Sequence, residues 1–204
     1  MSSWVVALAA VALAAQPALA RFKAGTLPGP PAYNVGGGEV LLEAALDAGG
    51  RVTVVRTLRD TPPYTEALRG AVGSWTFEPA RDAQGEGTRS LVLVAGSFRP
   101  PTSTGPAAGQ PPKDVAAPSP GLPFPVTTVP ALYPPQARDD AQVLVEMTVA
   151  GDGTPAVQVV RGAPGFNEAA LQAASQWRFR PTPGRAYVLF GFRQPVGTLP
   201  PPAR

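Results

Sequence analysis

The chain contains two stretches in which apolar and polar residues alternate, and the two stretches align with each other. They cover residues 40–47 and 143–150, and a glycine-rich turn sequence follows each of them. One set of alternate positions is wholly apolar in both, which predicts a half-buried strand. Because glycine accepts a positive φ without steric cost, the glycines predict tight turns. Second strands are expected after these turns, over residues 52–58 and 156–161.

The polar side of each stretch carries a glutamate at the matching place, Glu43 in the first and Glu146 in the second. Carboxylates are rarely buried unless they are paired. We therefore expect both glutamates to lie on the polar face of their strands.

The periodicity then changes to that of a helix, again in both halves. Thr65 and Asn167 are good N-cap residues, because their side-chain oxygens can accept hydrogen bonds from free amides of a first helical turn. Tyr64 and Phe166, directly before them, are expected to act as hydrophobic staples. Apolar residues at helical spacing follow, which predicts a helix of two to three turns in each half.

Each expected helix leads into an aromatic pair followed by proline. The residues are Trp75, Phe77 and Pro79 in the first half and Trp177, Phe179 and Pro181 in the second. Proline cannot continue a helix, and the alternation places both rings on one side, where we expect them to pack against the sheet. A third strand is expected over residues 90–98 and 187–192. The order strand, strand, helix, strand thus occurs twice, which indicates a duplicated α+β module.

The first 20 residues have the pattern of an export signal. Residues 5–15 form an apolar run that is shorter than the ~20 residues a membrane-spanning helix needs. Ala18-Leu19-Ala20 has the small-x-small pattern of a cleavage site. Cleavage after Ala20 would start the mature chain at Arg21. Because Met1-Ser2-Ser3 carries no Lys or Arg, an uncleaved membrane anchor is the alternative.

Proline and glycine, with 27 and 22 residues, divide the rest of the chain. Residues 100–129 are Pro-rich and are expected to form an extended linker, which serves either as a spacer between separately bound partners or as a passive tether. The expected organisation is a signal peptide (1–20), an N-terminal tail (21–34), a first module (35–99), the linker (100–129), a second module (130–196) and a Pro-rich tail (197–204). Modules of this size are marginal without disulfides or metals, so we expect them to pack on each other or to self-associate.

The composition excludes several kinds of chemistry. The chain has no cysteine and no histidine, which rules out disulfides, Cys/His zinc sites and Ser-His-Asp catalysis. The net charge is only +3 and the arginines are scattered, so no nucleic-acid partner is expected. No constellation of carboxylates suggests a catalytic centre. We therefore expect neither an enzyme nor a bound metal or cofactor.

These motifs together resemble the C-terminal domain of the TonB family of periplasmic energy transducers. The second half is the more similar one. Its matching segments are the Gly151-Asp152-Gly153 turn, residues 166–171, residues 177–181 and Phe192. Tyr133-Pro134, followed by Ala137-Arg138, is similar to the entry segment of the family. The first half is similar over residues 40–79 and lacks that segment.

The resemblance implies two tandem α+β modules, each with a three-stranded antiparallel sheet and one packed helix. It also implies protein binding in the periplasm, because family members pair a short peptide of an outer-membrane transporter with an exposed strand. The corresponding positions here are Tyr133, Pro134, Tyr187, Val188, Leu189, Phe190 and Phe192. We therefore expect a periplasmic protein that binds a peptide strand of an envelope or transporter partner in TonB-dependent transport. The alternative is a structural or assembly protein of the cell envelope that binds no transporter peptide.

Overall fold

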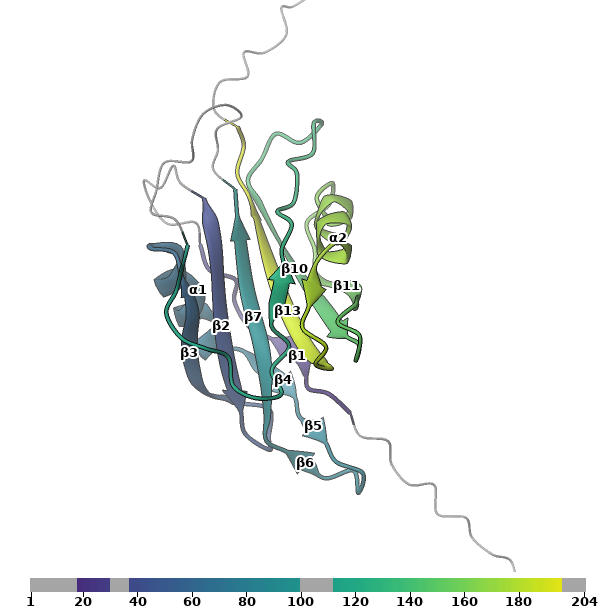
Figure 1. Ribbon diagram of the computed structural model, residues 1–204. Coiled ribbons are helices and arrows are strands. Elements are labelled where there is room, and N and C mark those ends of the chain that lie inside the picture. Colours follow the sequence, from purple (N-terminus) through teal and green to yellow (C-terminus); the bar gives the residue numbers. More distant parts are fainter. Residues whose placement is uncertain (1–17, 30–36, 100–111, 196–204) are drawn as a thin grey trace, which may run out of the picture.

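A seven-stranded mixed sheet forms the centre of the computed structural model, which describes residues 18–29, 37–99 and 112–195 (Figure 1). The strand order is β11-β10-β13-β7-β2-β3-β8. The first half supplies β2 (Gly38–Leu46), β3 (Val52–Asp60), α1 (Tyr64–Gly73) and β7 (Ser90–Phe98). The second half supplies β10 (Ala141–Val149), β11 (Pro155–Arg161), α2 (Asn167–Ser175) and β13 (Gly184–Phe192).

Short strands complete the structure. They are β1 (Arg21–Ala24), β4 (Thr76–Glu78), β5 (Ala80–Arg81), β6 (Gly87–Thr88), β8 (Lys113–Asp114), β9 (Pro125–Thr127) and β12 (Arg178–Phe179). Several expectations lie outside the described residues: the signal segment up to residue 17, residues 30–36 of the tail, residues 100–111 of the linker, and the Pro-rich tail.

Both halves have the expected order of strands and helix. In the first half β2 pairs antiparallel with β3 and β7, and in the second β10 pairs antiparallel with β11 and β13. The expectation of two separate three-stranded sheets is wrong, because β7 and β13 pair with each other in parallel. Leu189 of β13 lies opposite Gly96 of β7 in this pairing. The two halves therefore share one continuous sheet.

The two helices cover opposite faces of that sheet. Leu42 packs in the core under α1, whereas its neighbour Leu41 packs in the core under α2. Each core crosses the junction, since the α1 core includes Tyr187 and Leu189 of the second half and the α2 core includes Leu93 of the first. Because β7 and β13 pair in parallel, the face that α1 covers in the first half and the face that α2 covers in the second half lie on opposite sides of the shared sheet. Both faces of the central strands are therefore buried.

The expected helix caps differ in detail from the structure. Neither helix has a side-chain cap hydrogen bond. Thr65 Oγ1 instead accepts from the N–H of Thr61 at 2.8 Å, and Asn167 Oδ1 accepts from the N–H of Ala163 at 2.9 Å. Both side chains thus hold the loop that enters the helix, and they do so identically in the two halves.

Each half is preceded by a segment that contacts both halves. The first leading segment (residues 18–29) contains β1, which pairs with β4, and it reaches Tyr187 of the second half. The second leading segment (residues 112–133) contains β8, which pairs with β3 of the first half, and β9, which pairs with β12. Ala20 and Leu122, one from each segment, are only 2% and 3% exposed. The described parts of the predicted tail and linker are therefore packed, and residues 112–129 do not form an extended spacer.

Candidate interaction site

The strand expected to bind a partner is not an edge of the sheet. β13 is hydrogen-bonded to β10 on one side and to β7 on the other, and Tyr187, Val188, Leu189, Phe190 and Phe192 are all buried. A peptide could pair with β13 only if the two halves separated. The prediction of an open edge at β13 is therefore wrong, because the strand that would be free in a single module is used to join two modules.

The predicted entry segment lies at the surface of the second half. The ring of Tyr133 contacts Phe166 edge-on at a centroid distance of 5.7 Å, and its hydroxyl donates to the carbonyl of Asp139 at 2.9 Å. Pro134 accepts a hydrogen bond from the N–H of Ala137 in the following turn. Both residues are half-buried, so part of each remains open to solvent. The structure does not place them beside an open strand edge of β13.

The aromatic signature residues belong to the core, as expected. Trp75, Phe77, Trp177 and Phe179 are buried. The two indoles also have a polar role that the sequence pattern did not reveal. Trp75 Nε1 donates to the carbonyl of Thr26 at 2.8 Å, and Trp177 Nε1 donates to the carbonyl of Val129 at 2.9 Å. Each indole thus fixes the leading segment of its own half at the point where that segment crosses to the other half.

Glu43 and Glu146 are not on a solvated face, contrary to expectation. Their exposed fractions are 6% and 2%. The polar side of each strand is buried because the leading segments cover it. A buried carboxylate is destabilising unless charged or hydrogen-bonding groups compensate it. Both glutamates are compensated, but by different partners.

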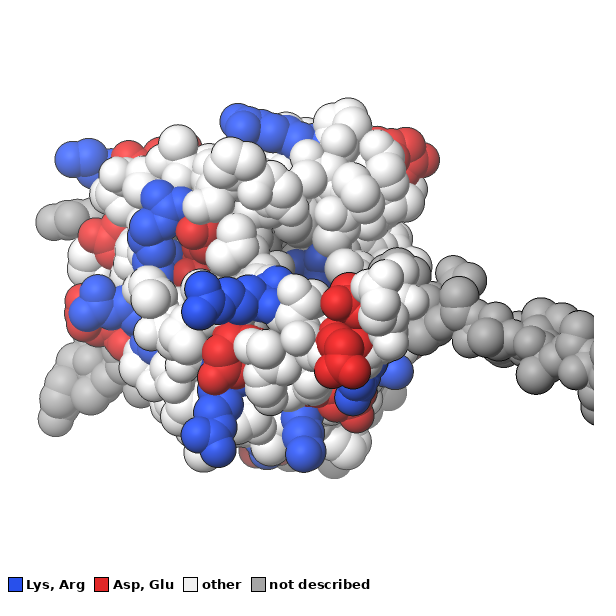
Figure 2. Space-filling view, turned by 90° about the horizontal axis from the view of Figure 1, so that it is seen from below, with Lys and Arg blue, Asp and Glu red and all other residues white. Residues whose placement is uncertain are grey.

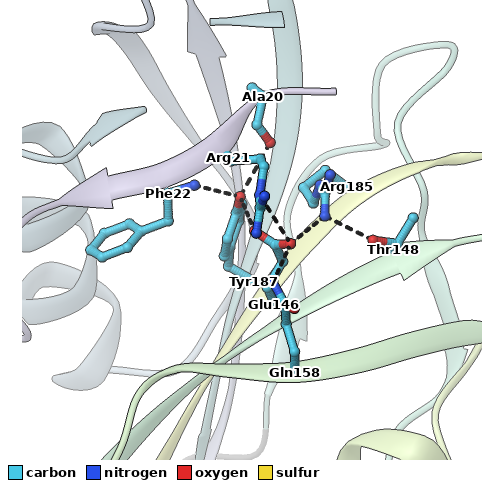
Figure 3. A network of polar contacts seen from close by, with 8 residues as sticks. All are labelled: Ala20, Arg21, Phe22, Glu146, Thr148, Gln158, Arg185 and Tyr187. Carbon is cyan, nitrogen blue, oxygen red and sulfur yellow. Dashed lines mark hydrogen bonds and ion pairs between the residues drawn. The ribbon is translucent and has the colours of Figure 1, made fainter. Parts of the chain in front are cut away.

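The partners of Glu146 link the first leading segment to the second half (Figure 3). Arg185 donates to Glu146 Oε1 and, at 2.7 Å, to Thr148 Oγ1. Gln158 Nε2 donates to Glu146 Oε1 at 3.0 Å. The Tyr187 hydroxyl lies 3.0 Å from Glu146 Oε2 and accepts from the N–H of Phe22 at 2.8 Å. Burial, together with the Glu146 charge, raises the pKa of Tyr187, so the phenol stays protonated and can donate to the carboxylate.

Glu43 has an equivalent cluster on the other face. Arg56 binds both carboxylate oxygens through Nη2 at 3.0 Å, and the N–H and hydroxyl of Ser119 donate at 2.8 and 2.9 Å. Burial alone would raise the pKa of Glu43, but the hydrogen bonds from Arg56 and Ser119 outweigh it and lower the pKa below its ordinary value of 4.5. Because Ser119 belongs to the second leading segment, this carboxylate holds that segment on the first half.

This lowered pKa makes the stability of the protein depend on pH. A carboxyl group whose pKa is lower in the folded state contributes stability above its unfolded pKa and loses it as the pH falls through the folded value. We expect Glu43→Gln to lower the free energy of unfolding at pH 7 by about 1.5–3 kcal/mol. The difference from the unmodified chain should shrink below about pH 4.5. Urea unfolding between pH 3 and pH 7 measures it, with the exposed Glu66→Gln as control, and a difference that is constant with pH would contradict the assignment.

Two sheet edges remain after the halves are joined. β11 is the last strand on one side, and α2 and β10 are its packing neighbours. On the other side β8 pairs with β3 at Arg59 and Asp60 alone. The accessible strand of the second half is therefore β11 and not β13.

The face of the molecule seen from below carries no broad field of one sign (Figure 2). Figure 2 shows basic and acidic side chains interspersed over the face of the molecule seen from below. Within the described ranges, no three acidic side chains gather in a way that could hold a metal ion. No helix in the described part of the chain is long and apolar enough to cross a membrane.

Comparison with known proteins finds a similarity within the second half. Residues 130–195 match the family model described as Gram-negative bacterial TonB protein C-terminal, and this match covers one copy. The kinship of the first half to that family stays a prediction, although the element order is the same. No curated protein and no solved structure matches the chain. Residues 130–195 are thus similar in sequence to the TonB C-terminal family, and in the structure the last strand of this half is joined to a module with the same element order.

Proposed function

We propose that this protein is a protein-binding component of TonB-related transport, which engages a peptide segment of an outer-membrane transporter or another envelope protein in the periplasm. The match of residues 130–195 to the TonB C-terminal family carries the proposal. A domain of this family is associated with protein interaction rather than with catalysis.

The fold supports a modified form of this interaction. The last strand of the matched domain is occupied by β7, so a partner strand must use another surface of the second half. β11 and the entry segment around Tyr133 and Pro134 are the exposed candidates. We propose that residues 1–20 direct export and that the folded part acts in the periplasm.

Peptide binding by the full chain tests this function. The probe is a labelled synthetic peptide with the sequence of the N-terminal periplasmic segment of an outer-membrane transporter from the same bacterium. We expect a dissociation constant on the order of micromolar by calorimetry, which corresponds to about −8 kcal/mol. Tyr133→Ser should weaken binding several-fold, whereas replacement of the neighbouring, exposed Leu132 by serine should not.

An outcome without binding would favour the other function. If no transporter peptide binds but crosslinking in the intact envelope captures structural envelope proteins, the chain serves assembly and the transport proposal fails. The unfolding midpoints of both variants must match that of the unmodified chain, so that a binding change reports the surface and not the fold.

A further inference from the structure

β3 and β11 occupy equivalent places in their halves, because each is the strand of its module that lies farthest from the junction between the halves. Arg59 of β3 lies opposite Leu41, and Arg161 of β11 lies opposite Leu144. In both halves the register shifts directly after this pair. Arg59 and Arg161 are therefore the same position of the duplicated module.

In the first half this edge is occupied by a strand of the chain itself. β8 pairs antiparallel with β3, with Asp114 opposite Arg59. The guanidinium binds both carboxylate oxygens of Asp114, at 2.6 and 3.2 Å. The N–H of Val115 continues the pairing with a bond of 2.8 Å to the carbonyl of Leu58. The first half thus shows, within one molecule, how this edge accepts an extended segment that places an Asp opposite the arginine.

In the second half the same edge has no strand beside it among the described residues. Arg161 is exposed and donates to the carbonyl of Gly25 at 2.5 Å, and no described carboxylate forms an ion pair with it. A hollow of about 290 Å³ lies beside β11, lined by Arg21, Glu146, Thr148, Ala156, Val157, Gln158 and Arg185. Its two arginines pair with its one glutamate, and Arg185 Nε has no hydrogen-bond partner among the described residues. At this edge Arg161 carries a positive charge that no described carboxylate neutralises.

We propose that β11 binds an extended segment of a partner protein, antiparallel to it, with an Asp or Glu opposite Arg161. This inference rests on the proposed function and names the surface and the chemistry of the partner. Backbone pairing supplies the affinity, and the Arg161–carboxylate pair sets the register, as Arg59 and Asp114 do on the equivalent edge.

The chain itself does not supply this acidic segment. All 14 of its Asp and Glu residues lie within the described ranges, and none of them pairs with Arg161. The segments 1–17, 30–36, 100–111 and 196–204 contain no acidic side chain. In the proposal, the side-chain carboxylate that matches Arg161 therefore comes from another polypeptide chain.

A peptide copied from the occupied edge provides the probe. The full chain, labelled with ¹⁵N, is titrated to millimolar concentration with a synthetic peptide of residues 112–122, whose own copy already fills β3. We expect amide shifts along β11 and not along β3. Arg161→Glu should weaken binding about five- to tenfold, in line with about 1 kcal/mol for an exposed ion pair. The peptide with Asp114→Lys should restore the affinity of that variant.

Several results would overturn the proposal. These are the absence of shifts at millimolar peptide, shifts confined to another surface, or affinity that Arg161→Glu leaves unchanged. The exposed Arg89→Glu serves as the matched charge control and should have no effect. Protection of β11 that rises with protein concentration, without peptide, would show that a second copy occupies the edge.

The transporter peptide separates this proposal from the proposed function. If that peptide binds with β11 unperturbed, the function stands and the β11 site falls. If the transporter peptide binds nowhere while the peptide of residues 112–122 binds at β11, the edge is a strand-binding site and the proposed transport function is wrong.

Discussion

Replacing Glu146 by alanine is expected to lower the free energy of unfolding by about 3–5 kcal/mol, because it leaves a buried cation without its partner. The Arg185 side chain is 11% exposed, and its guanidinium would retain Thr148 as its hydrogen-bond partner. The Tyr187 hydroxyl would also lose an acceptor in a buried position. For a chain of this size, each kcal/mol corresponds to about 2–4 °C in melting temperature. Calorimetry should therefore show a decrease on the order of 10 °C.

A second variant separates the charge from the packing. Adding Arg185→Met to Glu146→Ala removes the unpaired cation and should recover a large part of the lost stability, since apolar replacement of a whole buried pair is often neutral. Glu66→Ala, at an exposed position with its nearest cation at 3.9 Å, should change the melting temperature little. If the double variant is no more stable than Glu146→Ala, the buried pair is not the cause of the loss.

Proline at Val188 is expected to unfold both halves together. In an edge strand a proline can be tolerated where the N–H faces solvent, but β13 has hydrogen-bonded neighbours on both sides. The carbonyl that loses its ladder partner is left buried and unsatisfied, which costs about 1–3 kcal/mol, and the steric conflict of the proline ring adds to this cost. Because the cores under α1 and α2 both include residues of β13, the loss extends to the first half. The fluorescence of Trp75 and Trp177, each observed in a variant lacking the other and Trp4, should change at the same urea concentration.

Val188→Ala is the matched control for the proline. It retains the N–H and should leave a folded protein with a lower midpoint, by about 1–3 kcal/mol for the buried methyl groups. Two separate unfolding transitions, with Trp75 stable after Trp177 has unfolded, would contradict a shared sheet.

The local elements of this fold could be predicted from the sequence because their signals lie within a few residues. Alternation identified β2 and β10, glycines identified the turns, and the aromatic-x-aromatic-x-proline pattern placed Trp75 and Trp177 in the core. The junction between the halves depends on β7 pairing with β13, which no local pattern encodes. The sequence nevertheless contains one indication that these two strands are central. Residues 91–95 and 186–190 are apolar at consecutive positions, which is typical of strands buried on both faces.

The candidate site was predicted less well, for a related reason. Val188 and its neighbours were correctly placed in a strand, but whether a strand is an edge depends on the whole sheet. Glu43 and Glu146 are buried because the two leading segments cover them, and these contacts join residues that are far apart in the sequence. Aligning the two halves could have identified Arg161, since it corresponds to Arg59. That alignment alone does not indicate a binding site, because the role of the arginine becomes visible only from the contact between Arg59 and Asp114 in the structure.

The crossing of the leading segments has a consequence for the origin of the protein. Two structurally equivalent modules, joined along their last strands and held by leading segments that contact both halves, have the arrangement that duplication and fusion of a swapped homodimer would produce. In such an ancestor, association would depend on concentration. Fusion through residues 100–111 makes the same association intramolecular, so that it persists at any dilution. It also frees the two copies to diverge, one retaining an occupied edge and the other an open one.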